Sequence, residues 1–213
     1  MTDPHTRQAI ARLRALERRN TPNMREIRRW LSKALADEPP RVVRKVAQNL
    51  IDGGYRWFGY EVVNNHSKTL RSLKLKDVEG FGAGIASWSD VDTFAGYIAG
   101  PAWTNGQISD AAVRRWTRSQ DRWWRRTSLV ATTTWNLKSK GGVGDAKRTL
   151  DIAGRLVADH DDMVVKALSW ALRTLVAWDA EAVRGFLHQH TDDLAARVKR
   201  EVRNKLETGL KNR

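Results

Sequence analysis

The sequence predicts an all-α protein built as a stack of antiparallel helix pairs. Three observations favour this class: apolar residues recur at helical spacing, no segment shows the alternation of a half-buried strand, and the five prolines all lie near expected element boundaries. Helices of ordinary length joined by short loops would pack as neighbouring pairs. Because no repeated consensus is visible, the stack is inferred from helix pairing alone, and a compact helical bundle is the alternative.

The first half of the chain divides at its prolines and glycines. A first helix is expected over residues 3–19, and a second opens at Thr21-Pro22, where a capping residue precedes proline at the first helical position. Pro39-Pro40 ends that helix and precedes "RVVRKVAQNLIDGG", whose paired glycines stop the next one. A further helix is expected in "YRWFGYEVVNNH". The stretch at 67–86 is basic, rich in glycine and looser.

The second half contains longer helical segments. A helix beginning near residue 88 should end at Pro101 and "TNGQ". Helices then follow in "ISDAAVRRWTRSQ" and in "DRWWRRTSLVATTTWN", although the β-branched run in the latter favours a strand by propensity. The segment "KGGVGDAK" lacks the Gly-Lys-Ser/Thr of a phosphate loop and is interpreted as a flexible connection. The last helices are expected near 144–158, 162–177, 180–189 and 191–209.

Composition narrows the classes of partner. The 213 residues are enough for one domain over 1–213, and the formal net charge of +14 favours binding to a polyanion, most often nucleic acid. The absence of cysteine excludes disulfides and cysteine-ligated zinc. The N-terminal residues resemble no secretion signal, and the longest uncharged runs are too short to span a membrane. We therefore expect a soluble, cytoplasmic protein without membrane association.

The stretch "SWSDVDTFAGYIAG", residues 87–100, carries an acid at the edge of an apolar face. On a helix, Asp92 lies one turn after Trp88, at the rim of an arc that contains Trp88 and the apolar residues Val91, Phe94, Ala95, Ile98 and Ala99. A half-buried carboxylate is costly unless it is paired. Either Asp92 has a function, or it belongs to a helix cap, since Ser87-x-x-Asp90 and Ser89-x-x-Asp92 both resemble capping boxes.

Two further segments combine cations with tryptophan. In "DDMVVKALSWALRTLVAW", Trp170 lies between Lys166 and Arg173 on the face away from the leucines, which suits either a ligand or a cation–π contact between helices. The segment "RRWTRSQDRWWRRT" concentrates arginines that match phosphate oxygens. The alternative for this cluster is a solvated basic face. Its arginines are Arg114, Arg115, Arg118, Arg122, Arg125 and Arg126.

Taken together, "WSDVD" (88–92), "RWWRRTSL" (122–129) and "VVKALSWALR" (164–173), followed by "VKRE" (198–201), resemble the bacterial alkylpurine DNA glycosylases of the AlkD type. Family patterns include W-D-x-V-D, W-x-x-R at a helix start and K-A-I-x-W-x-L-R. The resemblance extends more loosely through "NTPNMREIRRWL" and "YRWFGYEVV", and so covers most of the chain. This sequence departs from the patterns at Ser89, which replaces the first acid, and fits them poorly at 67–86.

The resemblance implies a right-handed superhelix of HEAT-like helix pairs and a role for each matched residue. Asp92 matches the catalytic aspartate, Trp88 and Trp170 match the two tryptophans that frame the damaged nucleotide, and Arg126 matches an arginine that contacts the DNA backbone. The implied protein is a monomeric DNA glycosylase, associated with a bacterial nucleoid, that uses neither a cofactor nor a metal. Its remaining DNA-binding residues are expected to be Arg118, Arg122, Arg125, Lys166 and Arg173.

The implied substrate is duplex DNA that contains purines alkylated at N3 or N7. Such a base is cationic and already a good leaving group, so the general acid of ordinary glycoside cleavage is not required. A single carboxylate in an aromatic-lined cleft would stabilise the oxocarbenium-like sugar and orient a water molecule. The alternatives are a non-catalytic HEAT-like DNA-binding protein and a HEAT-like scaffold that binds acidic proteins.

Overall fold

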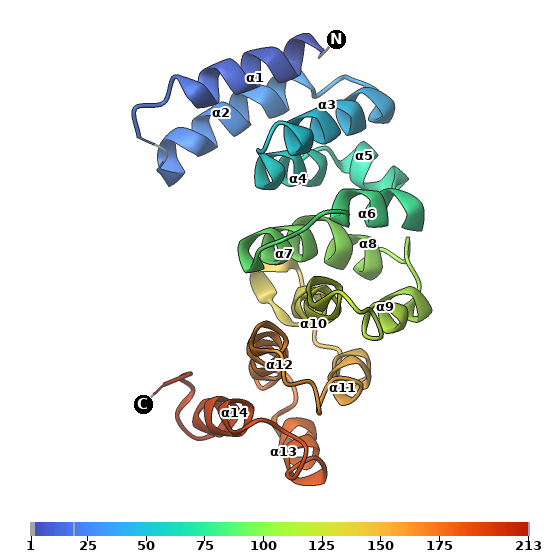
Figure 1. The fold of residues 1–213 in the computed structure, drawn as a ribbon, viewed down its shortest axis with the longest axis vertical. Coiled ribbons are helices and arrows are strands. Elements are labelled where there is room, and N and C mark those ends of the chain that lie inside the picture. Colours follow the sequence, from blue (N-terminus) through green and yellow to red (C-terminus); the bar gives the residue numbers. More distant parts are fainter. Residues whose placement is uncertain (1–2, 19, 213) are drawn as a thin grey trace. The chain divides into compact units, whose positions relative to one another are not determined.

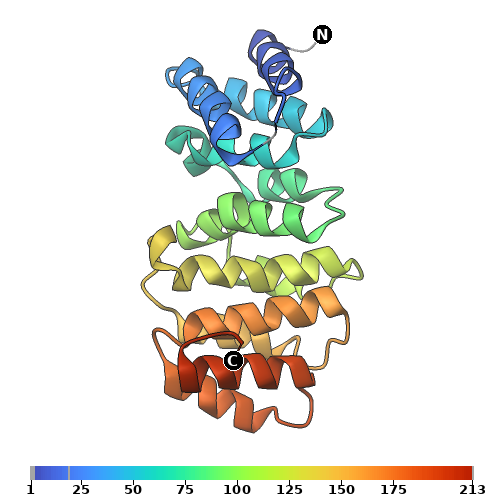
Figure 2. The same ribbon diagram turned by 90° about the vertical axis from the view of Figure 1, so that its left-hand side faces the viewer.

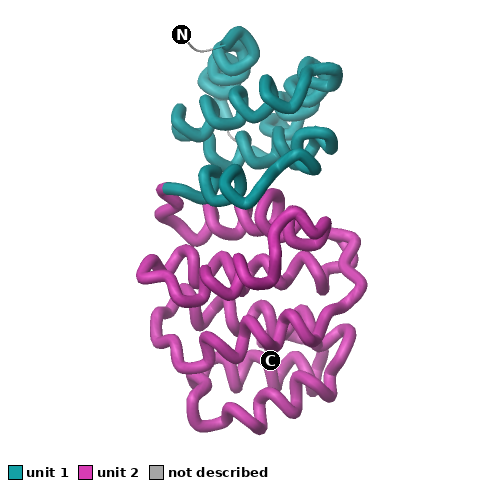
Figure 3. The backbone as a smooth tube through the Cα atoms, turned by 90° about the vertical axis from the view of Figure 1, so that its right-hand side faces the viewer, with its two compact units in different colours: residues 1–83 teal, residues 84–213 magenta. Residues whose placement is uncertain are grey.

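The computed structural model describes residues 3–18 and 20–212, and all of their regular structure is helical (Figure 1). The all-α prediction is confirmed for these residues. The chain forms two compact units, unit 1 up to Ala83 and unit 2 from Gly84 onward (Figure 3). Within the described residues, no helix is long and apolar enough to cross a membrane.

Unit 1 consists of two helix pairs followed by two short helices. Its helices are α1 (Pro4–Arg14), α2 (Thr21–Ala34), α3 (Pro40–Asp52), α4 (Arg56–Asn64), α5 (Ser67–Ser72) and α6 (Leu75–Gly82). The α1–α2 pair packs on the α3–α4 pair, since α1 contacts α3 and α2 contacts α4. Leu13, Leu31, Leu50 and Phe58 lie in the shared core. The side chains of Asp3 and Asn20 cap α1 and α2.

Two expectations for unit 1 need correction. The first helix ends at Arg14 and does not continue to residue 19, and the stretch at 67–86 contains the two short helices α5 and α6. The sequence obscured these helices because each is shorter than the window over which helical periodicity shows. The side chain of His66 caps α5, accepting the backbone N–H of Thr69 at 3.2 Å.

Unit 2 is a series of stacked helices that run back and forth (Figure 2). Helices α7, α10, α12 and α14 follow one another in contact along one side, and α9, α11 and α13 lie on the other side, at the right in Figure 1. The helices of unit 2 are α7 (Trp88–Phe94), α8 (Gly100–Thr104), α9 (Asp110–Trp116), α10 (Arg122–Asn136), α11 (Ala146–Gly154), α12 (Asp162–Leu175), α13 (Ala180–Gln189) and α14 (Ala196–Thr208).

The helix that carries Asp92 does not end at Pro101, as the sequence suggested. A π-helical segment, Ala95–Ala99, joins α7 to α8, and the N–H of Gly100 bonds to the carbonyl of Ala95. Proline lacks an N–H and crowds the carbonyl four residues earlier, so the wider π turn lets the chain stay helical through Pro101. Gly100 is required here, since a Cβ would lie 2.1 Å from Oγ1 of Thr134.

Helix α10 confirms the helical prediction over the β-branched run "LVATTTW". Three threonine hydroxyls turn back onto their own helix: Thr127 donates to the carbonyl of Trp123, Thr132 to Leu129 and Thr133 to Val130, at 2.7–2.8 Å. These bonds satisfy hydroxyl groups that the packed helix buries. Tertiary burial between α7 and α12 therefore overrides the strand propensity of this segment.

Candidate active site

Asp92 is not part of a helix cap. Helix α7 begins at Trp88 and is capped by Ser87, whose Oγ accepts the backbone N–H of Asp90 at 3.1 Å. Ser89 lies inside the first turn, and its hydroxyl is 3.0 Å from that of Ser87. Ser87 therefore caps the helix and Ser89 does not. The carboxylate of Asp92 is left for a long-range partner.

That partner is Arg126 on α10. Its Nη2 donates to Oδ1 of Asp92 at 2.7 Å and its Nε donates to the same oxygen at 3.2 Å. Its Nη1 donates to the backbone carbonyl of Met163, at the start of α12, at 2.6 Å. One guanidinium thus ties α7, α10 and α12 together, and fixes the position of the Asp92 carboxylate.

Asp92 and Arg126 differ in their exposure. The side chain of Arg126 is 6% exposed, whereas that of Asp92 is 23% exposed and still reaches solvent. Burial raises the pKa of Asp92 above its ordinary value of 3.8, and the charge and hydrogen bonds of Arg126 oppose that rise. The site therefore holds an incompletely hydrated carboxylate whose negative charge depends on one permanently charged neighbour.

A small cavity of about 200 Å³ lies beside this pair, lined by Trp88, Arg126, Met163 and Lys166. Trp88 is 57% exposed, although the sequence placed it within the apolar arc. The other members of that arc are buried, as expected: Val91, Phe94, Ala95, Ile98 and Ala99. Trp88 differs because it is the first residue of α7, and a helical side chain leans toward the N-terminal turn, where here there is no helix to cover it.

Trp170 does not line the same cavity. It is half-buried and lies in a neighbouring cavity of about 290 Å³ together with Trp178, Arg173, Lys138 and other residues. Lys166, one turn earlier on α12, lines the cavity that contains Trp88. Trp88, Arg126 and Lys166 therefore line one cavity. Trp170 lies one turn after Lys166 on α12 and lines the neighbouring cavity.

Among the arginines predicted to bind DNA, Arg118 and Arg122 are exposed. Arg118 has no polar side-chain partner among the described residues. The guanidinium of Arg122 stacks over the ring of Trp123 at 4.7 Å and lies 3.4 Å from Asp161, with its side chain 51% exposed. Both side chains are available to a phosphate. Lys166 is 43% exposed and forms an ion pair at 2.6 Å with Asp162, one turn away.

The other predicted arginines are held by the fold. Arg125 donates to Asp159 at 2.7 Å and to the backbone carbonyls of Ser119 and Gln120. Arg173 donates to the Oγ of Ser169 at 3.1 Å, and burial lowers its pKa. Arg126, which was expected to contact the DNA backbone, directs its nitrogens inward to Asp92 and Met163. All three have hydrogen-bond partners within the protein, and their contact with DNA stays a prediction.

Sequence reasoning missed two features near the candidate site: the bond from Arg126 to the Met163 carbonyl, and the cavity that Trp170 and Trp178 line. The Met163 carbonyl accepts from Arg126 because it lies in the first turn of α12, an interaction that no side-chain pattern encodes. Trp178 donates its Nε1–H to the carbonyl of Asn136 at 2.7 Å, and only the high tryptophan content signalled it. Within the described part of the chain, no cluster of acidic and histidine side chains could hold a metal ion.

Residues 19–206 match the sequence profile of a family described as DNA alkylation repair enzyme. The chain belongs to this family. The match covers most of the chain. It includes unit 2 up to residue 206, and therefore Asp92, Arg126 and Lys166. No curated protein matches the chain. Membership makes DNA alkylation repair the general function and DNA the partner.

Proposed function

We propose that the protein is a monofunctional DNA glycosylase that hydrolyses the N-glycosidic bond of cationic N3- or N7-alkylated purines in duplex DNA. We further propose that it acts as a monomer and that residues 1–213 form one functional domain, a right-handed superhelical stack of HEAT-like helix pairs. One observation carries the proposal: a half-buried carboxylate, Asp92, is held by a buried arginine beside a cavity that an exposed tryptophan lines.

The chemistry requires only a small set of groups. The bond between C1′ and the purine nitrogen breaks with its electrons going to the base, which leaves neutral because alkylation made it cationic. Positive charge then develops on the sugar, where the Asp92 carboxylate stabilises it electrostatically. Water adds to C1′ and releases a proton to Asp92 or to solvent. No step needs a proton donor for the leaving base.

The surrounding residues have separate roles in this scheme. Trp88 offers an exposed ring against the deoxyribose, and Trp170 provides a second, half-buried ring that lines the neighbouring cavity. Arg126 positions the Asp92 carboxylate and favours its ionised form. Lys166, Arg122 and Arg118 supply charge for the DNA backbone. Arg125 and Arg173 act through the fold that presents these groups.

The test is release of free base from methylated duplex DNA, separated by chromatography. We expect the wild type to release 3-methyladenine or 7-methylguanine above the spontaneous rate, and Asp92→Asn to lose about 100-fold or more of that rate. Asn preserves the shape and an oxygen that accepts from Arg126, so duplex binding should stay close to that of the wild type. Equal release by both proteins, at the spontaneous rate, would exclude the enzymatic function.

A non-catalytic DNA-binding protein is the second candidate, and the Asp92–Arg126 pair also provides an argument for it. An ion pair at 2.7 Å between one half-buried and one buried side chain can serve the fold alone, by holding α7 against α10. That function predicts duplex binding with a strong dependence on salt, and no release of base by any variant.

A further inference from the structure

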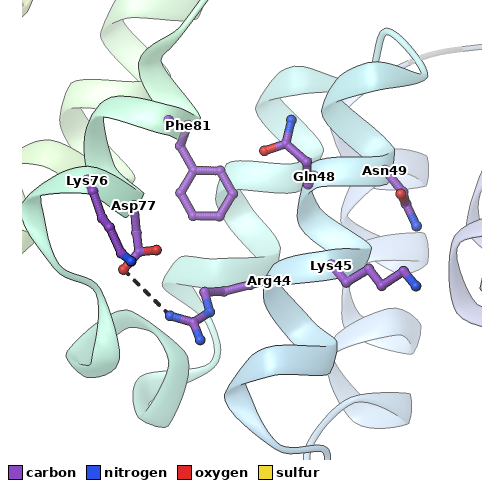
Figure 4. Close-up of a pocket in the computed structure, with 8 residues that line it drawn as sticks. Arg44, Lys45, Gln48, Asn49, Lys76, Asp77 and Phe81 are labelled. Atoms are coloured by element: carbon purple, nitrogen blue, oxygen red, sulfur yellow. Dashed lines mark ion pairs between the residues drawn. The ribbon is translucent and has the colours of Figure 1, made fainter.

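Unit 1 contains a groove that has no part in the candidate active site. It has a volume of about 520 Å³ and lies between α3 and α6 (Figure 4). Both helices belong to unit 1, whereas the Asp92 site belongs to unit 2. The residues that line the groove are Arg44, Lys45, Gln48, Asn49, Lys76, Asp77, Gly80 and Phe81.

The groove carries an excess of positive charge. Its single acid, Asp77, is committed to α6, because its Oδ2 accepts the backbone N–H of Lys74 at 2.9 Å. The same oxygen lies 3.6 Å from Nη1 of Arg44, beyond ordinary hydrogen-bond length. Lys45 and Lys76 are exposed and have no acidic partner among the described residues. Three cations thus face the groove against one acid.

These cations do not converge on one point. Consecutive helical residues point about 100° apart, which separates the side chains of Arg44 and Lys45 around α3. Figure 4 shows Arg44 directed toward α6, where Lys76 and Asp77 lie, and Lys45 extending in the opposite direction, away from α6. Charges spread in this manner suit a chain of repeated phosphates better than a single free one.

We propose that the α3–α6 groove is a second DNA-binding site, which contacts the phosphodiester backbone and adds affinity without taking part in excision. The partner is DNA because the family is one of DNA repair, and backbone phosphates carry negative charge at regular intervals. The inference needs DNA as a partner and does not need the glycosylase reaction, so each can fail without the other.

Gly80 provides a selective way to block the groove. It lies in α6 and lines the groove, and a Cβ added there would meet no atom within 4 Å. A side chain at this position therefore projects into open space and should not disturb packing. Gly80→Glu introduces a negative charge among the cations, and Gly80→Gln introduces the same shape without charge. Both replacements suit a helix better than glycine does.

The experiment measures binding of an undamaged fluorescent duplex by anisotropy at several salt concentrations, in an Asp92→Asn background. We expect the double variant Lys45→Gln, Lys76→Gln to weaken binding roughly 5- to 10-fold and to reduce the salt slope by about 1 to 2. Gly80→Glu should weaken binding by a similar factor, and Gly80→Gln by much less. Lys68→Gln, which removes an exposed charge from α5 outside the groove, is the matched control.

Three outcomes would overturn the proposal. The first is wild-type affinity in both the double-lysine variant and Gly80→Glu. The second is an equal loss in Lys68→Gln, which would make the effect one of general charge. The third is that the groove variants change the affinity for a free mononucleotide and leave the affinity for the duplex unaltered. Melting temperatures of all variants, measured in parallel, would separate these outcomes from misfolding.

Discussion

Two arginine–carboxylate pairs in unit 2 differ in what surrounds them. In the Asp92–Arg126 pair, the arginine is 6% exposed and the acid 23% exposed, beside a cavity. In the Arg173–Glu201 pair, the arginine is 18% exposed and the acid 8% exposed. The arrangement is thus reversed: the first pair buries its cation and presents its carboxylate, and the second buries its carboxylate.

The second pair is also more fully satisfied. Glu201 accepts from the hydroxyl of Ser169 at 2.6 Å, and Lys211 lies 3.6 Å from its other oxygen, so several donors share its charge. Among the described residues, the Asp92 carboxylate has Arg126 as its one polar partner, and burial raises its pKa. A carboxylate whose charge is poorly compensated is suited to stabilising a cation that arrives, whereas a fully compensated one holds helices together.

The largest expected effect is a difference in unfolding free energy between variants of the two pairs. Glu201→Ala leaves the Ser169 hydroxyl without its buried acceptor and Arg173 without the negative charge 3.8 Å away, and should cost about 3 kcal/mol of unfolding free energy. Asp92→Asn should cost little or nothing, because a raised pKa means that the folded state favours a neutral side chain at this position. Urea denaturation at neutral pH measures both.

The direction of the Asp92 effect with pH follows from the same shift. Because the folded-state pKa lies above 3.8, Asp92 contributes stability at low pH, and this contribution is lost as pH rises through the folded-state pKa. Asp92→Asn should remove that part of the pH dependence. A loss of more than about 1 kcal/mol in Asp92→Asn at neutral pH would show that the pair serves the fold, as Arg173–Glu201 does.

Helical periodicity in the sequence correctly predicted buried helix faces in unit 2. In α12 the leucines were expected on the face away from Trp170, and Leu168, Leu172 and Leu175 are all buried, since burial of one stripe at helical spacing is a local property. The same reasoning placed the π-segment side chains correctly although it ended the helix too early. Periodicity encodes neither the π turn at Ala95–Ala99, which keeps the chain helical through Pro101, nor the close approach of Gly100 to Thr134 on another helix.

The candidate site rests on contacts that periodicity does not encode. Asp92 and Arg126 are 34 positions apart, and each was singled out on its own segment, yet neither pattern indicated that they bind each other. The exposure of Trp88 was missed for a related reason, because a helical wheel ignores where a helix begins. The resemblance supplied the residues, and the structure supplies the pairing between them.

The second expected effect tests how strongly Asp92 depends on its one partner. In the proposed reaction the Asp92 carboxylate acts in its ionised form, so the rate should fall as pH decreases through the pKa of Asp92. Arg126→Gln removes the charge that opposes the rise in this pKa, so its acid limb should lie at higher pH than that of the wild type, with on the order of 10-fold less activity on the acid side.

Arg126→Lys is the matched control, because it keeps the charge and loses the paired N–H groups. Its acid limb should lie between those of the wild type and Arg126→Gln. Spontaneous depurination at each pH is subtracted with a protein-free sample. A uniform loss at every pH in Arg126→Gln would assign the arginine to binding or folding, without any control over ionisation of Asp92.

The smallest expected effect concerns Trp88, whose ring lines the cavity beside the Asp92–Arg126 pair. Trp88 is exposed beside the cavity, so its ring is free to cover a bound sugar and to limit water around Asp92. Trp88→Ala should lower single-turnover excision roughly 5-fold, as expected for loss of about 1 kcal/mol of ring contact, and Trp88→Phe should restore most of it. Because the side chain is more than half exposed, the melting temperature should not change. If Trp88→Phe is as impaired as Trp88→Ala, a flat apolar surface is not what this position supplies. The contrast between the partly exposed carboxylate of Asp92 and the buried carboxylate of Glu201 would then rest on Asp92 and its partner, without a contribution from the ring.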